Sequence, residues 1–267
     1  MNNNGSMGYP WGVAFGRNGL WAVADSSYHC VYIFDVEDEL VRKFGSNGSN
    51  NGQFSSPRGV AFDSHNHLYV VESGNHRVQK FDTNGTYLLQ FGSKGSAAGQ
   101  LYNPMGIAVH KDKVYIADYN NKRVSVFHNN GQFYNTFGSD VLGNLRDVAV
   151  SADKYLVVAG YNPHCIYTFT LDGHYIGKFG TKGSGRCQFN YPHGITGDLN
   201  GFIIIADSNN HRVSIFDKDG NYVHCFGSNG SANGQFSDPH GIALSPNGNI
   251  YVTDCGNKRI QIFSTFN

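Results

Sequence analysis

Short runs of alternating apolar and polar residues recur along the whole chain, each bounded by glycine, proline, asparagine or aspartate. One unit contains four such runs, at residues 59–62, 68–71, 78–81 and 87–91. Alternation over four to eight residues is typical of half-buried strands, and the separating residues are those of tight turns. Each unit therefore predicts four short antiparallel strands.

A phenylalanine closes the third run of every unit, and its recurrence sets the period of the repeat. Successive separations are 47, 46, 42, 47 and 47 residues. A Pro-x-Gly before the first run recurs in the same register in five units, with Leu145-Arg146-Asp147 standing in its place in the fourth unit, and a Phe-Gly follows the fourth run of the first five units. Units of this size must stack on their neighbours to bury their apolar faces, and four antiparallel strands at this period describe a propeller blade. The phenylalanines are Phe34, Phe81, Phe127, Phe169, Phe216 and Phe263.

The pattern thus predicts an all-β fold, a six-bladed β-propeller that forms one domain over residues 1–267. The expected blades are residues 8–45, 55–92, 102–138, 143–180, 190–227 and 237–267. The sixth unit reaches only its third strand, and residues 1–9 match only the loop before Pro-x-Gly. We therefore expect the last blade to lack its outer strand, in a domain cut from a longer protein, with an upstream segment or a partner covering the unpaired edge.

The loop between the second and third strands reads Asp-x-x-Asn-x-Arg in four units, with Glu replacing Asp once. On these loops, and on segments such as residues 205–213 (IADSNNHRV), the chain resembles NHL-repeat propellers, named for Asn-His-Leu. It is especially similar to the C-terminal domains of TRIM-NHL proteins, over essentially its whole length, and the resemblance also implies six blades. Units one and four depart from the pattern, with Cys30 and Cys165 at the arginine position and Gly160 at the acid position. The loops that carry the motif are Glu72/Asn75/Arg77, Asp118/Asn121/Arg123, Asp207/Asn210/Arg212 and Asp254/Asn257/Arg259.

The six units serve as an internal control that separates scaffold from site. A residue type shared by nearly all blades is expected to do the same structural work in each. By this test the Asp-x-x-Asn-x-Arg set is scaffold: Asp and Asn cap loop backbone groups, and Arg bonds to carbonyls or to the acid. An exposed position that differs between blades is expected to carry function.

The overall charge is zero, with 20 Lys and Arg against 20 Asp and Glu, but its distribution is uneven. Loops between strands two and three, and between strand four and the next blade, share one face of a propeller, here called the top face. These loops carry eleven basic and eight acidic residues, a balance of +3, and six of the twelve histidines. The opposite, bottom face carries five basic and twelve acidic residues, a balance of −7. We therefore expect a dipolar molecule whose top face attracts anionic ligands.

Two rings of variable residues mark the candidate binding surface on the top face. The middle residue of Pro-x-Gly is expected to line the mouth of the central channel, and the residue before the loop arginine forms the second ring. Basic groups interleaved with flat aromatic groups suit phosphates and unstacked bases, although a solvated rim of chance composition is the simpler alternative. The first ring is Trp11, Arg58, Met105, Arg146, His193 and His240. From the second ring and its surroundings we select His76, Tyr119, Lys122, Tyr161, His211 and Lys258.

The resemblance implies that this face recognises RNA elements or protein partners, often in proteins that carry the RING, B-box and coiled-coil segments of ubiquitin ligases. None of those segments is in this chain. The sequence therefore favours a non-catalytic domain that binds RNA through its top face. The alternative is a propeller that selects protein partners for ubiquitination, which the neutral total charge favours, because RNA-binding domains are often strongly basic. No DNA partner is expected.

An enzymatic interpretation is less well supported by the residues. Some six-bladed relatives are peptidyl-hydroxyglycine lyases that hold zinc with histidines near the channel mouth, and His193 and His240 occupy matching ring positions. Catalytic zinc needs about three protein ligands, whereas the other residues of the ring include no good third ligand. Two of them are arginines, which repel a cation. No Gly-x-Ser-x-Gly nucleophile motif occurs. We therefore expect no catalytic residues, metal or cofactor.

The cysteines and the hydropathy pattern bear on location. Five cysteines without a CxxC pair fit no closed disulfide framework, which favours a reduced, cytoplasmic protein. No run approaches the roughly 18 apolar residues of a membrane span, so no membrane partner is expected.

Overall fold

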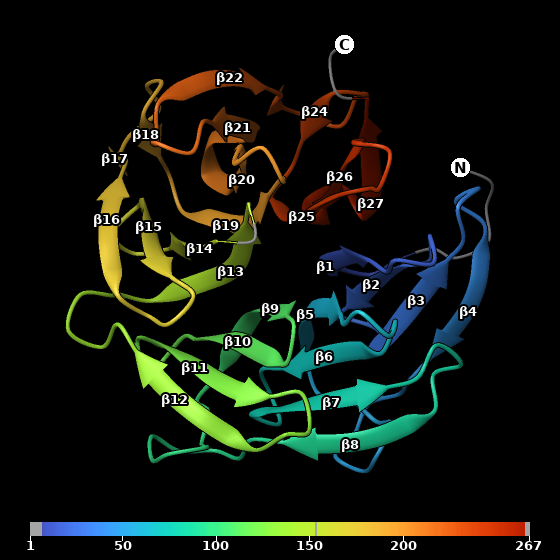
Figure 1. Cartoon of the computed structure of the whole chain (residues 1–267). Helices are drawn as coiled ribbons and strands as arrows, with labels where there is room; N and C mark the ends of the chain where they lie inside the picture. The colour runs from blue at the N-terminus through green and yellow to red at the C-terminus, as the bar shows by residue number, and fades with distance from the viewer. Residues whose placement is uncertain (1–6, 153, 265–267) are drawn as a thin grey trace.

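Six antiparallel sheets stand around a common axis, with the first strand of each nearest the centre (Figure 1). The computed structural model describes residues 7–152 and 154–264, so residues 1–6, 153 and 265–267 of the predicted domain lie outside the described part. The six-bladed β-propeller predicted from the repeat is confirmed. Among the described residues the sixth sheet has three strands, as expected, and the other five have four.

Strands follow one another from the axis outward within each blade. Blade one contains β1 (Pro10–Phe15), β2 (Trp21–Asp25), β3 (Cys30–Phe34) and β4 (Leu40–Phe44). Blade two contains β5 (Pro57–Phe62), β6 (Leu68–Glu72), β7 (Arg77–Phe81) and β8 (Tyr87–Phe91). Blade three contains β9 (Pro104–His110), β10 (Lys113–Asp118), β11 (Arg123–His128) and β12 (Phe133–Phe137).

The second half of the wheel has the same arrangement. Blade four contains β13 (Leu145–Ser151), β14 (Tyr155–Gly160), β15 (Cys165–Thr170) and β16 (Tyr175–Phe179). Blade five contains β19 (Pro192–Gly197), β20 (Ile203–Asp207), β21 (Arg212–Phe216) and β22 (Tyr222–Phe226), and blade six contains β25 (Pro239–Leu244), β26 (Ile250–Asp254) and β27 (Arg259–Phe263). The connecting loops form two short parallel pairs, β17 (Thr181–Lys182) with β18 (Gln188–Phe189) and β23 (Ser228–Asn229) with β24 (Gln235–Phe236), and two 3₁₀ turns, η1 (Ser208–Asn210) and η2 (Cys255–Asn257).

The phenylalanines that set the period hold neighbouring blades together. Phe81 on β7 lies 5.0 Å, ring centre to ring centre, from Phe44 of the preceding blade, and Phe216 on β21 lies 5.0 Å from Phe179. The same pairing of a Phe-Gly phenylalanine with a third-strand phenylalanine joins blades two to three, three to four and five to six. Each such aromatic pair contributes about 0.5–1.5 kcal/mol beyond its buried area, which explains why the phenylalanines recur in blades two to six. Phe34 of blade one stacks instead on Trp21 of its own blade.

The Asp-x-x-Asn-x-Arg loops have the geometry of a scaffold. Asp207 accepts hydrogen bonds from the Arg212 Nε at 2.9 Å and the Asn210 side-chain amide at 2.7 Å. The Arg212 guanidinium also donates to three backbone carbonyls of the loop that leads into blade five. Glu72, Asp118 and Asp254 make the matching ion pair with their own loop arginines. These carboxylates therefore fix loops to blades.

A ring of glycines brings the six inner strands into contact around the axis. A Cβ added at Gly194 would lie 2.2 Å from the His240 carbonyl oxygen, and one at Gly241 would lie 2.2 Å from that of Trp11. Glycine is needed at these positions because the backbone of the next blade occupies the space of a side chain. Asp147 stands at the equivalent position of blade four, as the one side chain in the ring.

Candidate functional site

The top end of the inner strands is shaped by a β-bulge at Pro-x-Gly. In blade one Pro10 pairs with Asp25, whereas the next pair is Val13 with Val23, so the register shifts across Trp11 and Gly12. The two innermost strands of each of the remaining five blades show a register shift at the same place. Because a bulge re-aims the side chain that it carries, the middle residue of each Pro-x-Gly lies at the mouth of the channel, and so does Arg146 of Leu145-Arg146-Asp147 in blade four.

The structure brings the first-ring residues together at this mouth. Trp11 lies 5.4 Å from His240 and 6.1 Å from His193, measured between ring centres. The Arg58 guanidinium lies 5.4 Å from the centre of the Trp11 ring, and an Arg146 terminal nitrogen lies 3.6 Å from the Met105 sulfur. Residues from six blades thus form one cluster, which we call the mouth cluster: Trp11, Arg58, Met105, Arg146, His193 and His240.

Two stacked imidazoles form one side of the mouth cluster. The rings of His193 and His240 lie 3.9 Å apart at an interplanar angle of 23°, and both side chains are more than nine-tenths buried. Burial, followed by the repulsion of His240 and the charges of Arg146 and Arg58, lowers the pKa of His193 well below its ordinary value. Both rings therefore remain neutral near pH 7, because burial also lowers the pKa of His240.

The guanidinium groups of Arg58 and Arg146 form the other side of the mouth cluster. Arg146 lies 4.1 Å from the centre of the Tyr161 ring and 5.0 Å from that of Tyr119, and Arg58 faces Trp11. Both arginines are only half-buried, and such cation–π contacts hold a guanidinium while its N–H groups remain able to bind an anion. Tyr119 and Tyr161, which were predicted from the sequence, therefore lie next to Arg146.

Several polar atoms of the mouth cluster lack a protein partner. Within residues 7–152 and 154–264, the Nε of Arg146 and the Nδ1 atoms of His193 and His240 are buried without a hydrogen-bond partner. Leaving such groups unsatisfied costs about 1–3 kcal/mol each. The cluster therefore contains hydrogen-bonding groups that are neither satisfied within the described protein nor exposed to solvent.

A hydrogen-bonded group that the sequence pattern did not single out supports the cluster. The Tyr9 hydroxyl donates to Asp238 at 2.6 Å, and the Nε2 of His240 lies 3.1 Å from the other carboxylate oxygen. Burial alone would raise the pKa of Asp238, but the hydrogen bonds from His240, Tyr9 and Ser208, together with the positive charge that His240 gains at acidic pH, hold that pKa at about 2. Tyr9, Asp238 and Tyr191 all precede a Pro-x-Gly proline, so comparing blades at that position would have revealed them as variable residues.

The second ring is divided between structural and exposed residues. All six of its members have a positive φ between 52° and 56°, so the ring is first a backbone feature of the loop. The Nδ1 of His76 accepts a hydrogen bond from the Asn103 backbone N–H of the next blade at 3.0 Å, which ties two blades together. His211 is half-buried, whereas Lys122 and Lys258 are exposed and remain open to a ligand.

The top-face charge is less positive than its histidines suggested. Burial is the first cause that lowers the pKa of His76, His164, His193 and His240, so these four histidines add no charge near pH 7. Four acidic residues of the top face form ion pairs with the four loop arginines, so neither partner is free to bind a ligand. The arginines of the mouth cluster are thus the cations most directly available at the channel.

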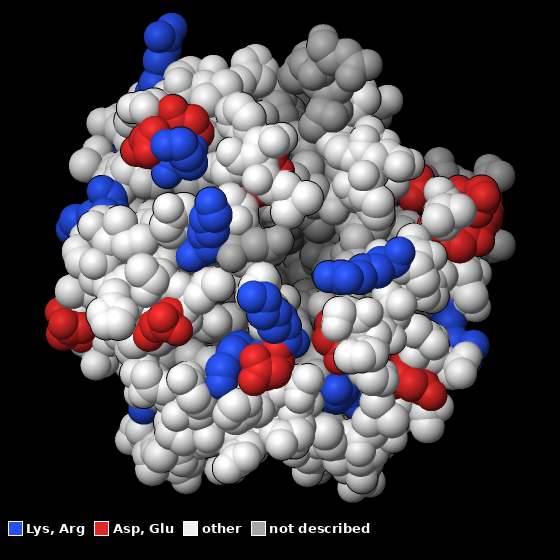
Figure 2. All heavy atoms as spheres, in the orientation of Figure 1, with Lys and Arg blue, Asp and Glu red and all other residues white. Residues whose placement is uncertain are grey.

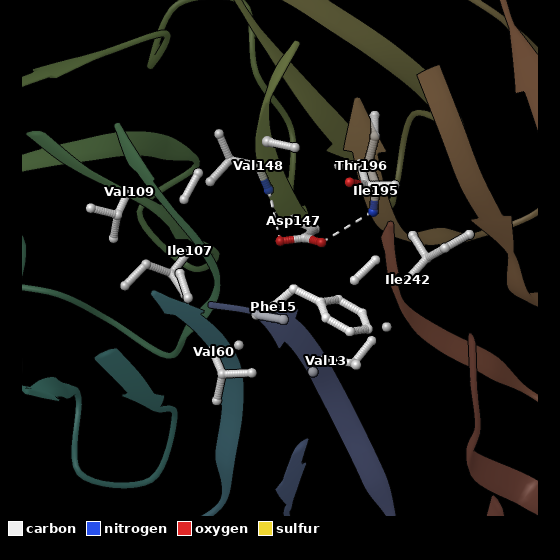
Figure 3. Close-up of a pocket in the computed structure, with 18 of the residues that line it drawn as sticks. Val13, Phe15, Val60, Ile107, Val109, Asp147, Val148, Ile195, Thr196 and Ile242 are labelled. Carbon is white, nitrogen blue, oxygen red and sulfur yellow. Dashed lines mark hydrogen bonds between the residues drawn. The ribbon is translucent and has the colours of Figure 1, made fainter. Parts of the chain in front are cut away.

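A channel of about 260 Å³ continues below the mouth and is lined mainly by apolar side chains of the inner strands. Figure 2 views the wheel along its axis and shows a hollow at the centre. Asp147 projects into this channel and accepts the backbone N–H groups of Val148 at 2.9 Å and Ile195 at 3.1 Å (Figure 3). Burial raises the pKa of Asp147 to about 7, even though both hydrogen bonds oppose the shift.

The mouth cluster does not suit a catalytic cation. His193 and His240 are its only metal-binding side chains besides the Met105 thioether, and their stacked rings do not converge on a common point. The charges of Arg58 and Arg146 act on both imidazoles and would oppose a divalent ion. An anion fits this donor set better, because guanidinium N–H groups only donate.

Comparisons with known proteins agree with the fold and the repeat. The NHL repeat model matches residues 54–81, 101–127, 189–216 and 236–263. These segments fall in blades two, three, five and six, and the two unmatched blades are those whose loops depart from Asp-x-x-Asn-x-Arg. The chain therefore contains NHL repeats on a six-bladed propeller. No curated protein matches the chain.

Solved structures of similar fold have diverse functions. A streptogramin B lyase is 14% identical with a TM-score of 0.70, covering 100% of this chain and 86% of the lyase. A gluconolactonase from Xanthomonas campestris is 16% identical with a TM-score of 0.73, covering 97% of this chain and 86% of the gluconolactonase. A chain of the nidogen/laminin complex is 17% identical with a TM-score of 0.66, covering 81% of this chain and 79% of that one. Such low identities show the shared fold alone.

All five cysteines carry free thiols. Within residues 7–152 and 154–264, no helix has the length and hydropathy needed to cross a bilayer.

Proposed function

We propose that this chain is a non-catalytic recognition domain that binds RNA through its top face. The observation that carries the proposal is the mouth cluster, where Arg58 and Arg146 lie against the aromatic rings of Trp11 and Tyr161. Phosphates would bind the guanidiniums, and a base would stack on Tyr119 or Tyr161. The exposed Lys122 and Lys258 would extend the contact along the rim.

The repeat motif supports a wider setting for this activity. On the resemblance to TRIM-NHL proteins, we propose that the chain is the recognition part of a cytoplasmic protein of that type, whose other segments would act as a ubiquitin ligase. Free thiols on all five cysteines are compatible with that compartment. The lyase and lactonase folds among similar structures keep an enzymatic role as the alternative to be tested.

A protein partner is the second candidate, and the burial of the mouth cluster favours it. Trp11, His193 and His240 are each more than nine-tenths buried, so the accessible part of the mouth is small. A single acidic side chain or chain terminus would fill it more readily than an extended strand of RNA. In that case the propeller would select proteins rather than transcripts.

Salt dependence tests the proposal. Affinity for a pool of randomised single-stranded RNA should fall steeply as salt rises, with a log–log slope that reports the number of phosphates contacted. A pull-down with this domain, divided into RNase-treated and untreated halves, identifies the natural partner. Partners that disappear only after RNase treatment support RNA recognition. Proteins retained in both halves, together with no measurable RNA affinity at low salt, would favour the second candidate.

A further inference from the structure

A cluster of three metal-binding side chains lies on the bottom face, away from the mouth. Asp63, His65 and His67 stand in the turn between β5 and β6, and one ligand atom from each lies within 4.8 Å of the other two. The rings of His65 and His67 have centres 5.9 Å apart. His65 is exposed and His67 is half-buried, so an ion can reach the cluster from solvent.

The turn itself does not need the histidines. Asp63 accepts the backbone N–H groups of His65 and His67, both at 2.9 Å. In blade five Asp198 caps the same turn by accepting the backbone N–H of Phe202 at 2.7 Å. Asn200 and Phe202 there occupy the positions of the two histidines. The aspartate is therefore scaffold, and the histidines are the residues that differ between blades.

The hydrogen bond between His67 and Asp63 prepares a ligand set. The Nδ1 of His67 lies 2.9 Å from the Asp63 Oδ2, and the Asp63 side chain is almost fully buried. The carboxylate is thus held in place by backbone bonds on one oxygen and faces the imidazole with the other. A metal ion that replaces the proton between them meets His65 as its third protein ligand.

We propose that Asp63, His65 and His67 bind a divalent transition-metal ion of the zinc class. Two imidazoles and one carboxylate are a set that zinc, nickel and copper accept. The Lys80 ammonium lies 3.3 Å from the same Asp63 oxygen and opposes any cation there, so binding depends on the two imidazoles, which zinc accepts as ligands and magnesium does not. A bound metal moves Lys80 toward the Asn129 carbonyl oxygen, which it already contacts at 3.3 Å.

Isothermal titration of the whole chain with zinc chloride tests the site, with magnesium chloride as the comparison ion. The informative variant is His65→Asn with His67→Phe, which gives blade two the residues that blade five carries in the same turn. We expect the wild type to bind one equivalent of zinc and no magnesium. The variant should bind zinc at least about 10-fold more weakly. His174→Asn, an exposed histidine in another bottom loop, should leave the affinity unchanged.

Three outcomes overturn the proposal. Equal zinc affinity in the wild type and the double variant would show that the ion binds elsewhere, and so would a loss of zinc binding in His174→Asn. If circular dichroism shows that the double variant does not fold, His65→Asn alone carries the test. Its side chain is exposed, and the same weakening of at least about 10-fold is expected. An unchanged affinity in that variant also contradicts the site.

Discussion

His193 and His240 stack at the channel mouth with ring centres 3.9 Å apart, although they come from different blades. Both are buried beside two arginines, and burial is the first cause that lowers both pKa values. In the unfolded chain each imidazole titrates near pH 6.5. The fold therefore has its full stability from this pair above pH 6.5 and loses it as the pH falls below that value, because the unfolded chain then binds more protons.

Replacing one ring of the pair should flatten this pH dependence. His193→Phe keeps an aromatic ring in the stack and removes one titrating group. Below pH 6.5 the wild type should lose up to about 1.4 kcal/mol of unfolding free energy per pH unit more than the variant. Urea denaturation at about pH 5 and about pH 7.5 measures the difference. Equal losses in the two proteins would mean that His193 is protonated in the folded state.

Asp147 should give the opposite pH dependence. Burial raises its pKa to about 7 in the fold, above the value of about 3.9 in unfolded chains. Its contribution to stability is therefore present at low pH and is lost as the pH rises toward 7. Asp147→Asn should remove this loss, so the variant should gain about 1–3 kcal/mol relative to the wild type between about pH 4.5 and pH 8. If the unfolding free energies of the wild type and of Asp147→Asn changed with pH by the same amount across that range, the burial argument would be contradicted.

The glycine ring predicts a sharp contrast between two glycine substitutions. A Cβ at Gly194 would lie 2.2 Å from the His240 carbonyl oxygen, whereas a Cβ at Gly177 on β16 would meet no atom of the described residues within 4 Å. Gly194→Ala should destabilise the fold by more than about 2 kcal/mol, because two backbones must separate. Gly177→Ala should change stability by no more than about 1 kcal/mol. Thermal denaturation of the pair measures both, and similar melting temperatures would show that the inner strands can move apart.

Scaffold and site arginines should respond differently to truncation. Arg77 is buried and pairs with Glu72 at 2.6 Å, so Arg77→Ala leaves a buried carboxylate unpaired and should cost about 3–5 kcal/mol. Arg58 is half-buried and contacts Trp11 and the Ser73 hydroxyl, so Arg58→Ala should cost about 1 kcal/mol or less. Chemical denaturation distinguishes the two roles. An equal cost at both positions would place Arg58 in the scaffold.

The repeat pattern was enough to predict the six-bladed fold, because each blade buries the same apolar positions against its neighbours. The third-strand phenylalanines and Pro-x-Gly identify the strands, and pairs such as Phe44 with Phe81 show why they recur. The first ring was also predictable, since Pro-x-Gly has one position free to vary. In a sequence with internal repeats, the repeats can be compared with one another to separate shared positions from variable ones.

Contacts across the closed ring could not be predicted in the same way. Tyr9 meets Asp238 only because blade one closes against blade six, 229 residues later. The neutrality of the top histidines depends on how deeply the closed wheel buries them, so counting them as potential positive charge overestimated the field. Asp147 is one of the eight acidic residues assigned to the top face from the sequence, whereas its position in the ring of glycines places it inside the channel.

The central claim is that Arg58 and Arg146 bind the ligand rather than hold the fold. The most direct measurement compares RNA affinity and melting temperature for Arg58→Gln with Arg146→Gln against a bottom-face control, Lys111→Gln with Lys154→Gln, whose lysines are exposed. Each double variant has two fewer positive charges than the wild type. We predict that the top-face variant binds at least about 10-fold more weakly at an unchanged melting temperature, since fewer phosphates are then neutralised by the protein, and that the control binds as the wild type does. Intact RNA affinity in the top-face variant, or equal weakening in both, would contradict the account.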